Sequence, residues 1–224
     1  MTRFEAIMVS RANYVAGIVF DCVGSLAAVV AGFVLGARLG PALVVIAAAA
    51  LWYTLVEYAV HRWIYHAGDS VMAVVHDRHH AEPKVMLGAP FYCSVSIWGL
   101  QGLAAGVLLG APLGLVFGGT LLFSYGQQTL IHHAAHRYPR LDVLGARSAL
   151  RRHHAVHHVV GDANFGVSTT LWDRVLGTYV TDLLGSAPVR PWWSRSRAWR
   201  VTRMELWRRT GAQDRSDDSA AWSR

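Results

Sequence analysis

Charged side chains and cysteines are scarce in this sequence, and their absence is informative. No Asp, Glu, Lys or Arg occurs between Val85 and Ile131. The 224 residues include two cysteines, Cys22 and Cys93, each within an apolar run. Two thiols cannot build a cysteine-rich metal site, and we expect two buried hydrophobic side chains rather than a disulfide. The chain is 53% hydrophobic and 16% charged, a composition typical of a membrane protein.

Four apolar segments are candidates to cross a bilayer. Roughly 20 helical residues span the hydrocarbon core, and the uncharged run after Val85 is longer than that. Gly110-Ala111-Pro112 predicts a break in its middle and therefore a helical hairpin. Because backbone polar groups in lipid must be satisfied internally, we expect helices. The first segment is too long for the apolar part of a signal peptide, so we expect it to be retained. The predicted spans are residues 14–36, 41–60, 91–109 and 112–131.

The basic residues predict an orientation. They lie before the first predicted span, in the 61–90 connection and after residue 131, whereas the two opposite connections contain only Arg38. The positive-inside rule therefore places both termini and the 61–90 connection in the cytoplasm. We predict an all-α integral membrane protein with a cytosolic helical cap formed by residues 61–90 and 132–187. The membrane would be the plasma (inner) membrane in a bacterium and the endoplasmic reticulum in a eukaryote.

The C-terminal part differs in composition from the rest. The net charge is +7, with twenty arginines and one lysine, and nine arginines lie after residue 189, interleaved with Trp192, Trp193, Trp199 and Trp207. Arginine and tryptophan beside membrane spans favour contact with anionic lipid headgroups, and no nucleic-acid-binding motif is present. We predict one membrane domain over residues 1–187 and an interfacial tail over 188–224, disordered after about residue 211.

All twelve histidines lie in two windows, residues 61–80 and 132–158. Their spacings are H-x4-H, H-x2-HH, H-x3-H and again H-x2-HH. Neutral imidazole is the commonest metal ligand among side chains. On a helix that turns about 100° per residue, each of the last three motifs presents its rings on one face. The predicted metal ligands are His61, His66, His76, His79, His80, His132, His136, His154, His157 and His158.

The number of histidines favours two metal ions. One ion cannot bind ten nitrogens, whereas two ions could take about five each and leave a position open. His61 and His66 are five residues apart, so either the helix is distorted there or each binds a different ion. His133 and His153 are left over, as ligands or as neighbours. Candidate carboxylate partners of the ligand rings are Glu57, Asp77, Asp162 and Asp173; Glu57, one turn before His61, is the best placed.

The combined motifs resemble the fatty acid hydroxylase/sterol desaturase superfamily of membrane di-iron enzymes. The resemblance extends from about Leu51 to Val180 and includes the stretch from Glu57 to Pro83. The second part, His154-Ala-Val-His157-His158 followed by Asn-Phe-Gly-Val, Trp-Asp and Gly-Thr, is closer and favours the fatty acid hydroxylase branch. One departure is Arg137, which stands where some relatives have another histidine.

The resemblance implies two Fe ions at the ten patterned histidines and O2-dependent hydroxylation of a fatty-acyl chain. Zinc could replace iron in purified protein. Beyond these ligands no catalytic residue is identified. The chain has no flavin, haem or cysteine-cluster motif, so we expect an external electron donor, a ferredoxin or cytochrome b5-like protein with its reductase. The alternatives are a sterol or carotenoid hydroxylase or desaturase of the same superfamily and, in another class, a membrane metal-binding or metal-transport protein.

Overall fold

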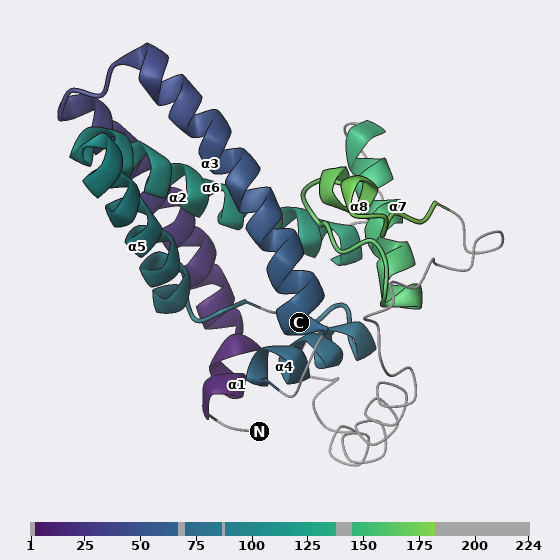
Figure 1. The fold of residues 1–224 in the computed structure, drawn as a ribbon. Coiled ribbons are helices and arrows are strands. Elements are labelled where there is room, and N and C mark those ends of the chain that lie inside the picture. The colour runs from purple at the N-terminus through teal and green to yellow at the C-terminus, as the bar shows by residue number, and fades with distance from the viewer. Residues whose placement is uncertain (1–2, 67–69, 87, 138–144, 182–224) are drawn as a thin grey trace. The chain divides into compact units, whose positions relative to one another are not determined.

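The structure is a computed structural model that describes residues 3–66, 70–86, 88–137 and 145–181. Within these ranges all regular structure is helical (Figure 1). The interfacial tail predicted over residues 188–224, with its predicted disorder, lies outside the described residues, as does the end of the predicted domain after residue 181. The elements are α1 (Arg3–Met8), α2 (Arg11–Val34), α3 (Leu39–Val60), the π-helix η1 (His61–Tyr65), α4 (Val71–Ala81), α5 (Phe91–Leu109), α6 (Ala111–Arg137), α7 (Gly145–Val160) and α8 (Leu171–Val175).

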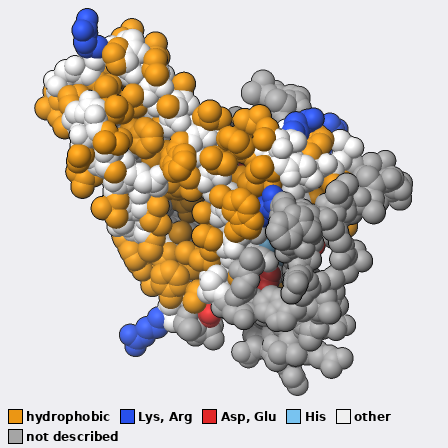
Figure 2. Space-filling model, viewed as in Figure 1, with side chains coloured by type: hydrophobic (Ala, Val, Ile, Leu, Met, Phe, Trp, Pro, Cys, Tyr) orange, Lys and Arg blue, Asp and Glu red, His pale blue; other side chains and the backbone are white. Residues whose placement is uncertain are grey.

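Three helices are long and apolar enough to cross a membrane. They are α2, the continuous helix formed by α3 and η1 (Leu39–Tyr65), and α5. Most of their residues are not buried within the protein, and Figure 2 shows hydrophobic side chains over most of the visible surface of the long helices. Apolar surface of this extent is stable facing lipid rather than water. The predicted spans 14–36, 41–60 and 91–109 correspond to these three helices.

Helix α6 contains the fourth predicted span but is not among these three helices. Its apolar N-terminal half is followed by Ser124, Gln127 and Gln128, which lower its hydropathy. The helix packs against α2, α3 and α5, and many of its residues are buried. A helix surrounded by other helices needs less apolar surface than one that faces lipid. It also continues past residue 131 to Arg137, so the bundle and His132 and His136 share one rigid element.

Small residues bring α5 and α6 into close contact. Gly110, at φ +89°, ends α5 and allows the tight connection that the sequence predicted there. Gly102 and Gly106 of α5 then face Gly114 and Gly118 of α6. A Cβ atom built on Gly114 would lie 2.4 Å from Gly106 Cα and 2.7 Å from the Gly102 carbonyl oxygen. This close backbone approach fixes the position of α6 against α5.

The short helices gather where α3 and α6 end (Figure 1). Helix α4 packs against η1, and α8 packs against α3, where the Trp172 indole donates to Thr54 Oγ1 at 3.0 Å. At the start of the bundle, Asn13 of α2 donates to the Gly88 and Ala89 carbonyls and accepts from the Phe91 amide. The first turns of α2 and α5 are therefore joined.

We predict that Gly114→Val destabilises the protein by about 2 kcal/mol or more, because the side chain overlaps the α5 backbone and cannot move away. Gly99→Val is the matched control, since nothing lies within 4 Å of its Cβ position. Thermal unfolding of both variants in detergent measures the effect. An equal loss of stability in both would show that the glycine contact does not hold the hairpin together.

Candidate metal centre

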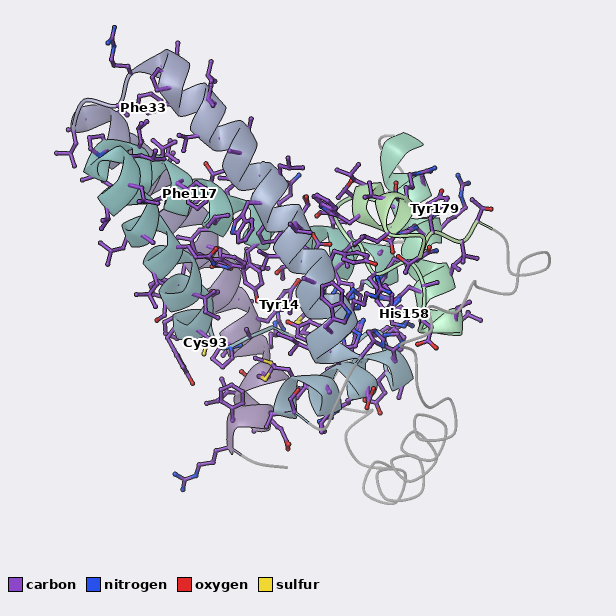
Figure 3. The ribbon with its side chains drawn as sticks, in the orientation of Figure 1. Tyr14, Phe33, Cys93, Phe117, His158 and Tyr179 are labelled. Carbon is purple, nitrogen blue, oxygen red and sulfur yellow. The ribbon has the colours of Figure 1, made fainter. Side chains whose placement is uncertain are left out.

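The ten histidines with ligand-like spacing form two groups of five. Within each group, one nitrogen from every ring lies within 4.8 Å of the others. Figure 3 shows His158 within a dense cluster of ring nitrogens, whereas Phe117 lies away from it in the helical bundle. Group 1 consists of His61, His66, His76, His80 and His157; group 2 consists of His79, His132, His136, His154 and His158.

The spacing of the nitrogens fits metal coordination. In group 1 the Nε2 atoms of His76, His66, His157 and His80 form a closed ring, with successive separations of 2.9, 3.1, 3.1 and 3.0 Å. The fifth, His61 Nε2, is 3.1 Å from His76 Nε2. A metal–nitrogen distance of about 2.1 Å implies about 3.0 Å between adjacent ligands at right angles. In group 2, His154 Nε2 is 2.9 Å from His136 Nε2 and 3.1 Å from His158 Nε2.

Hydrogen bonding alone does not account for these contacts. A neutral imidazole has one N–H, and His76 Nε2 faces the Nε2 atoms of His61, His66 and His80. One proton cannot serve three such contacts, so the remaining lone pairs would face one another. In group 2, neither ring nitrogen of the buried His79 has a partner among the described residues. A cation within each group would satisfy these nitrogens, so the residues present fit metal binding.

The two H-x2-HH motifs divide their histidines between the groups. On α4, His76 and His80 belong to group 1 and His79 to group 2. On α7 the division is reversed, with His154 and His158 in group 2 and His157 in group 1. The shared helical face that the sequence predicted therefore serves two centres. The rings of His80 and His158 stack at 4.3 Å between centroids, where the two groups meet.

The π-helix explains how His61 and His66 join the same group. These residues are five apart and would point in different directions on a regular α-helix. Residues His61–Tyr65 form a π-helix, in which hydrogen bonds run from i to i+5 and residues five apart come close to alignment. Of the two possibilities that the sequence left open, the structure therefore has the distorted helix and a shared group.

Burial favours the neutral form of grouped histidines on α4 and α7. It lowers the pKa of His76, His154 and His157 well below the ordinary value of 6.5, and the neighbouring imidazoles lower it further. The pKa of His158 is lowered to about 3, first by burial and then by His136 and His61. At neutral pH these nitrogens are available as ligands without the loss of a proton.

The segment between α7 and α8 supplies backbone carbonyls to group 1. His61 Nδ1 donates to the Phe165 carbonyl, and His157 Nδ1 donates to the Ala163 carbonyl at 2.8 Å. A carbonyl can only accept, so the proton of each neutral ring is on Nδ1 and the lone pair on Nε2. The clustered atoms in group 1 are the Nε2 atoms. This loop thus fixes both the orientation and the tautomer of two of the five rings.

Two of the four candidate carboxylates hold this loop. Glu57 Oε1 accepts from the Val167 amide at 2.5 Å and the Ser168 amide at 2.9 Å, and Oε2 accepts from Ser168 Oγ. Asp173 also binds loop amides, from α8. Glu57 therefore contacts the loop backbone rather than accepting from a histidine ring as the sequence suggested. Asp77 lies within α4, directly after His76, and Asp162 follows the end of α7.

His133 and His153 lie outside both groups. The His133 ring packs against Tyr14 at 5.3 Å between centroids. His153 is buried, stacks on Tyr179, and its Nε2 donates to Asp173 Oδ2 at 3.0 Å.

Sequence reasoning gave no role to Asn164. Its side chain donates to the His153 and Val180 carbonyls and accepts from the Val180 amide at 2.7 Å. The residue is fully buried and has φ +58°, a left-handed conformation that Asn tolerates better than most residues. The Asn-Phe-Gly-Val stretch formed part of the family resemblance, but the hydrogen-bond partners of its asparagine cannot be read from the sequence.

The comparison with curated proteins finds lipid hydroxylases. The chain is 28% identical over 148 residues to dihydroceramide fatty acyl 2-hydroxylase FAH2 of Arabidopsis thaliana, a match that covers 60% of each chain. It is 27% identical over 144 residues to fatty acid 2-hydroxylase of Rattus norvegicus, covering 59% of this chain and 38% of the relative. The matched region thus spans less than two thirds of the length of each of these relatives.

A solved structure and a family model extend the comparison. The fold is similar to that of full-length Scs7p, in which only the hydroxylase domain is visible, with a TM-score of 0.67, 20% identity, and coverage of 85% of this chain and 72% of that one. The model described as fatty acid hydroxylase matches residues 46–178, which include every histidine of both groups. The chain therefore belongs to the fatty acid hydroxylase family.

Proposed function

We propose that this protein is a non-haem di-iron enzyme of the membrane that uses O2 to hydroxylate the acyl chain of a lipid. The observation that carries the proposal is the convergence of ten imidazoles into two groups of five beside membrane-length helices. Five imidazoles would hold each ion and would leave it with capacity for a further ligand. A purely structural zinc site would use four ligands and remain closed.

The protein's own part is ligation, orientation and exclusion of water. In group 1, Nε2 of each ring would bind one iron, and the five histidines of group 2 would bind the other. When bound, the iron ions supply the activation of O2 that attack on an unactivated C–H bond requires, which no side chain provides. His76, His79, His154 and His157 are buried, so bulk water has little access to the reacting region.

The proposed topology keeps four spans, with α6 as the fourth. Both termini and the metal centre would face the cytoplasm, and residues 1–187 would act as one domain. Helix α6 runs from the bundle directly to His132 and His136, so it crosses from the lipid layer to the metal groups without a break. The membrane would be the inner membrane in a bacterium and the endoplasmic reticulum in a eukaryote.

The substrate class is proposed from the surroundings of the site. The outward faces of α2, α3 and α5 are apolar, so a lipid can approach the metal groups along the helices without leaving the bilayer. The curated relatives are named for hydroxylation of dihydroceramide fatty acyl chains and of fatty acids. A fatty-acyl lipid of this kind is therefore the proposed substrate, with zinc as a possible occupant of the site in purified protein.

Electrons would come from an external donor, a ferredoxin or cytochrome b5-like protein with its reductase. The sequence has no flavin, haem or cysteine-cluster motif. Arg151 and Arg152 of α7, next to His153 and His154, would offer positive charge to an acidic donor.

A sterol or carotenoid oxidase of the same superfamily and a metal transporter are the competing functions. A transporter binds its ions near the middle of the bilayer, on broken spans. Here the histidines lie at or beyond the C-terminal ends of α3 and α6 and on α4 and α7. This placement favours an enzyme.

Metal analysis tests the two groups. We predict two metal ions per chain in the wild type and about one in His80→Ala or His154→Ala, because each removes a ligand from a different group. His133→Ala should retain two, since His133 belongs to neither group. Mass-spectrometric metal analysis of purified protein measures the ratios. One ion or none in the wild type would exclude the dimetal centre.

Acid should destabilise the metal-free protein. The pKa of His158 is about 3 in the folded chain against 6.5 ordinarily, because burial disfavours the charged ring. As the pH falls below about 6.5, this histidine takes up a proton in the unfolded chain, whereas in the folded chain it does so only near pH 3. The free energy of unfolding therefore decreases as the pH is lowered from about 6.5 to about 3. Thermal unfolding of chelator-treated protein at pH 7 and pH 5 measures this, and His158→Gln should weaken the dependence. A midpoint that rises on acidification would contradict the argument.

Product analysis tests the reaction. Iron-loaded protein is incubated with a ferredoxin reducing system, ¹⁸O2 and a lipid extract. We expect one ¹⁸O atom in a fatty-acyl product and none in a reaction with the His80→Ala variant. Labelled sterol or carotenoid, or new double bonds without label, would support the related oxidases instead. Metal flux into vesicles without any oxidised lipid would support transport.

A further inference from the structure

We infer that Asp173 acts on the ligand His61 through a single peptide group and is a positioning residue of group 1. This inference rests on the dimetal centre proposed above. The peptide is the one between Phe165 and Gly166. Its carbonyl oxygen accepts the proton of His61 Nδ1, and its N–H donates to Asp173 Oδ2 at 2.8 Å. Carboxylate, peptide and imidazole thus form one continuous chain of hydrogen bonds.

Hydrogen bonds hold the Asp173 carboxylate in this position. Asp173 is fully buried. Its Oδ1 accepts from the Phe165 amide at 2.8 Å and from Thr178 Oγ1 at 2.7 Å, and its Oδ2 also accepts from His153 Nε2 at 3.0 Å. Four donors are enough to hold a carboxylate in one orientation away from water.

The glycine at position 166 allows the Phe165–Gly166 peptide to lie close to the Asp173 carboxylate. A Cβ atom at Gly166 would lie 2.0 Å from the Thr169 carbonyl oxygen and 3.0 Å from Asp173 Oδ2. Only glycine allows the Gly166 N–H to lie against the carboxylate in this turn.

The effect of the carboxylate is transmitted along such a chain because each hydrogen bond polarises the next. A carboxylate that accepts from the Gly166 N–H increases the negative charge on the carbonyl oxygen of the same peptide. That oxygen then accepts more strongly from His61 Nδ1, which makes Nε2 a better donor to a metal ion. The effect is that of a carboxylate–histidine pair, with one peptide interposed.

His157 provides a comparison within the same loop and the same group. Its Nδ1 donates to the Ala163 carbonyl, and the N–H of that peptide, on Asn164, donates to the Thr178 carbonyl oxygen at 2.9 Å. The chain has the same form, but it ends on a neutral carbonyl. His61 alone of these two rings is connected to a carboxylate.

The test uses Zn²⁺ as the probe in full-length protein labelled with ¹⁵N-histidine. Two quantities are measured: the zinc retained per chain against a chelator, and the proton resonance of each Nδ1–H, assigned with His61→Gln and His157→Gln. For Asp173→Asn we expect the His61 resonance to move upfield, that of His157 to stay, and one of two zinc ions to be lost about tenfold more readily.

Two further variants separate this relay from general support of the loop. Glu57→Gln alters a carboxylate that binds the Val167 and Ser168 amides, whose peptides carry no carbonyl bonded to His61; it should lower the unfolding temperature but leave the His61 resonance in place. His153→Phe keeps the ring stacked on Tyr179 and releases Asp173 Oδ2 for the Gly166 N–H. It should move the His61 resonance downfield, and it remains informative if Asp173→Asn does not fold.

Equal shifts of the His61 resonance in Asp173→Asn and Glu57→Gln would overturn the relay, as would no shift in His153→Phe. Two zinc ions in the wild type with an unchanged His61 resonance in Asp173→Asn would reject the relay and leave the dimetal centre standing. A wild type that binds no zinc would reject both.

Discussion

The structure depends on ten imidazoles that each direct a ring nitrogen into one of two small, largely buried regions. These nitrogens lie about 3 Å apart and have too few protons to hydrogen-bond to all their neighbours, whereas a cation between them would satisfy their lone pairs. The helix ends, the π-helix at His61–Tyr65 and the loop between α7 and α8 all serve this arrangement. Burial lowers the pKa of His76 on α4 and His157 on α7, so the folded chain presents these rings unprotonated and able to bind metal.

The helical bundle supplies the rigidity that this arrangement needs. Helix α6 is fixed by glycine contacts with α5 and by packing against α2 and α3, and it continues unbroken to His136. Helix α3 continues through η1 to Tyr65 in the same way, reaching His61 within the helix and His66 immediately after it. The positions of four of the clustered histidines are thus set by contacts made along the length of the bundle. Membrane anchoring and metal binding are parts of one structural unit.

The sequence alone predicted the parts of this structure that depend on local spacing. The ten histidines at ligand-like intervals are the ten that converge, and α5 begins and ends where the third predicted span does. What spacing could not provide is the division of each H-x2-HH motif between two groups, since that depends on where another helix lies. The contacts of Glu57 were missed for the same reason, because the loop that it binds is 110 residues away in sequence. Those of Asp173 are only seven and eight residues away, but they depend on the conformation of the loop, which spacing does not give. The low hydropathy of α6 is compatible with its packing against α2, α3 and α5, which a hydropathy average over the sequence does not take into account.

The division of adjacent histidines between the groups links the geometry of the two centres. His79 and His80 are consecutive on α4, as are His157 and His158 on α7, and each pair sends one ring to either centre. Consecutive Cα atoms are held about 3.8 Å apart by a planar peptide bond. Two pairs of consecutive residues therefore constrain the separation of the two groups. A change that shifts the register of either helix by one residue would therefore disturb both groups at once.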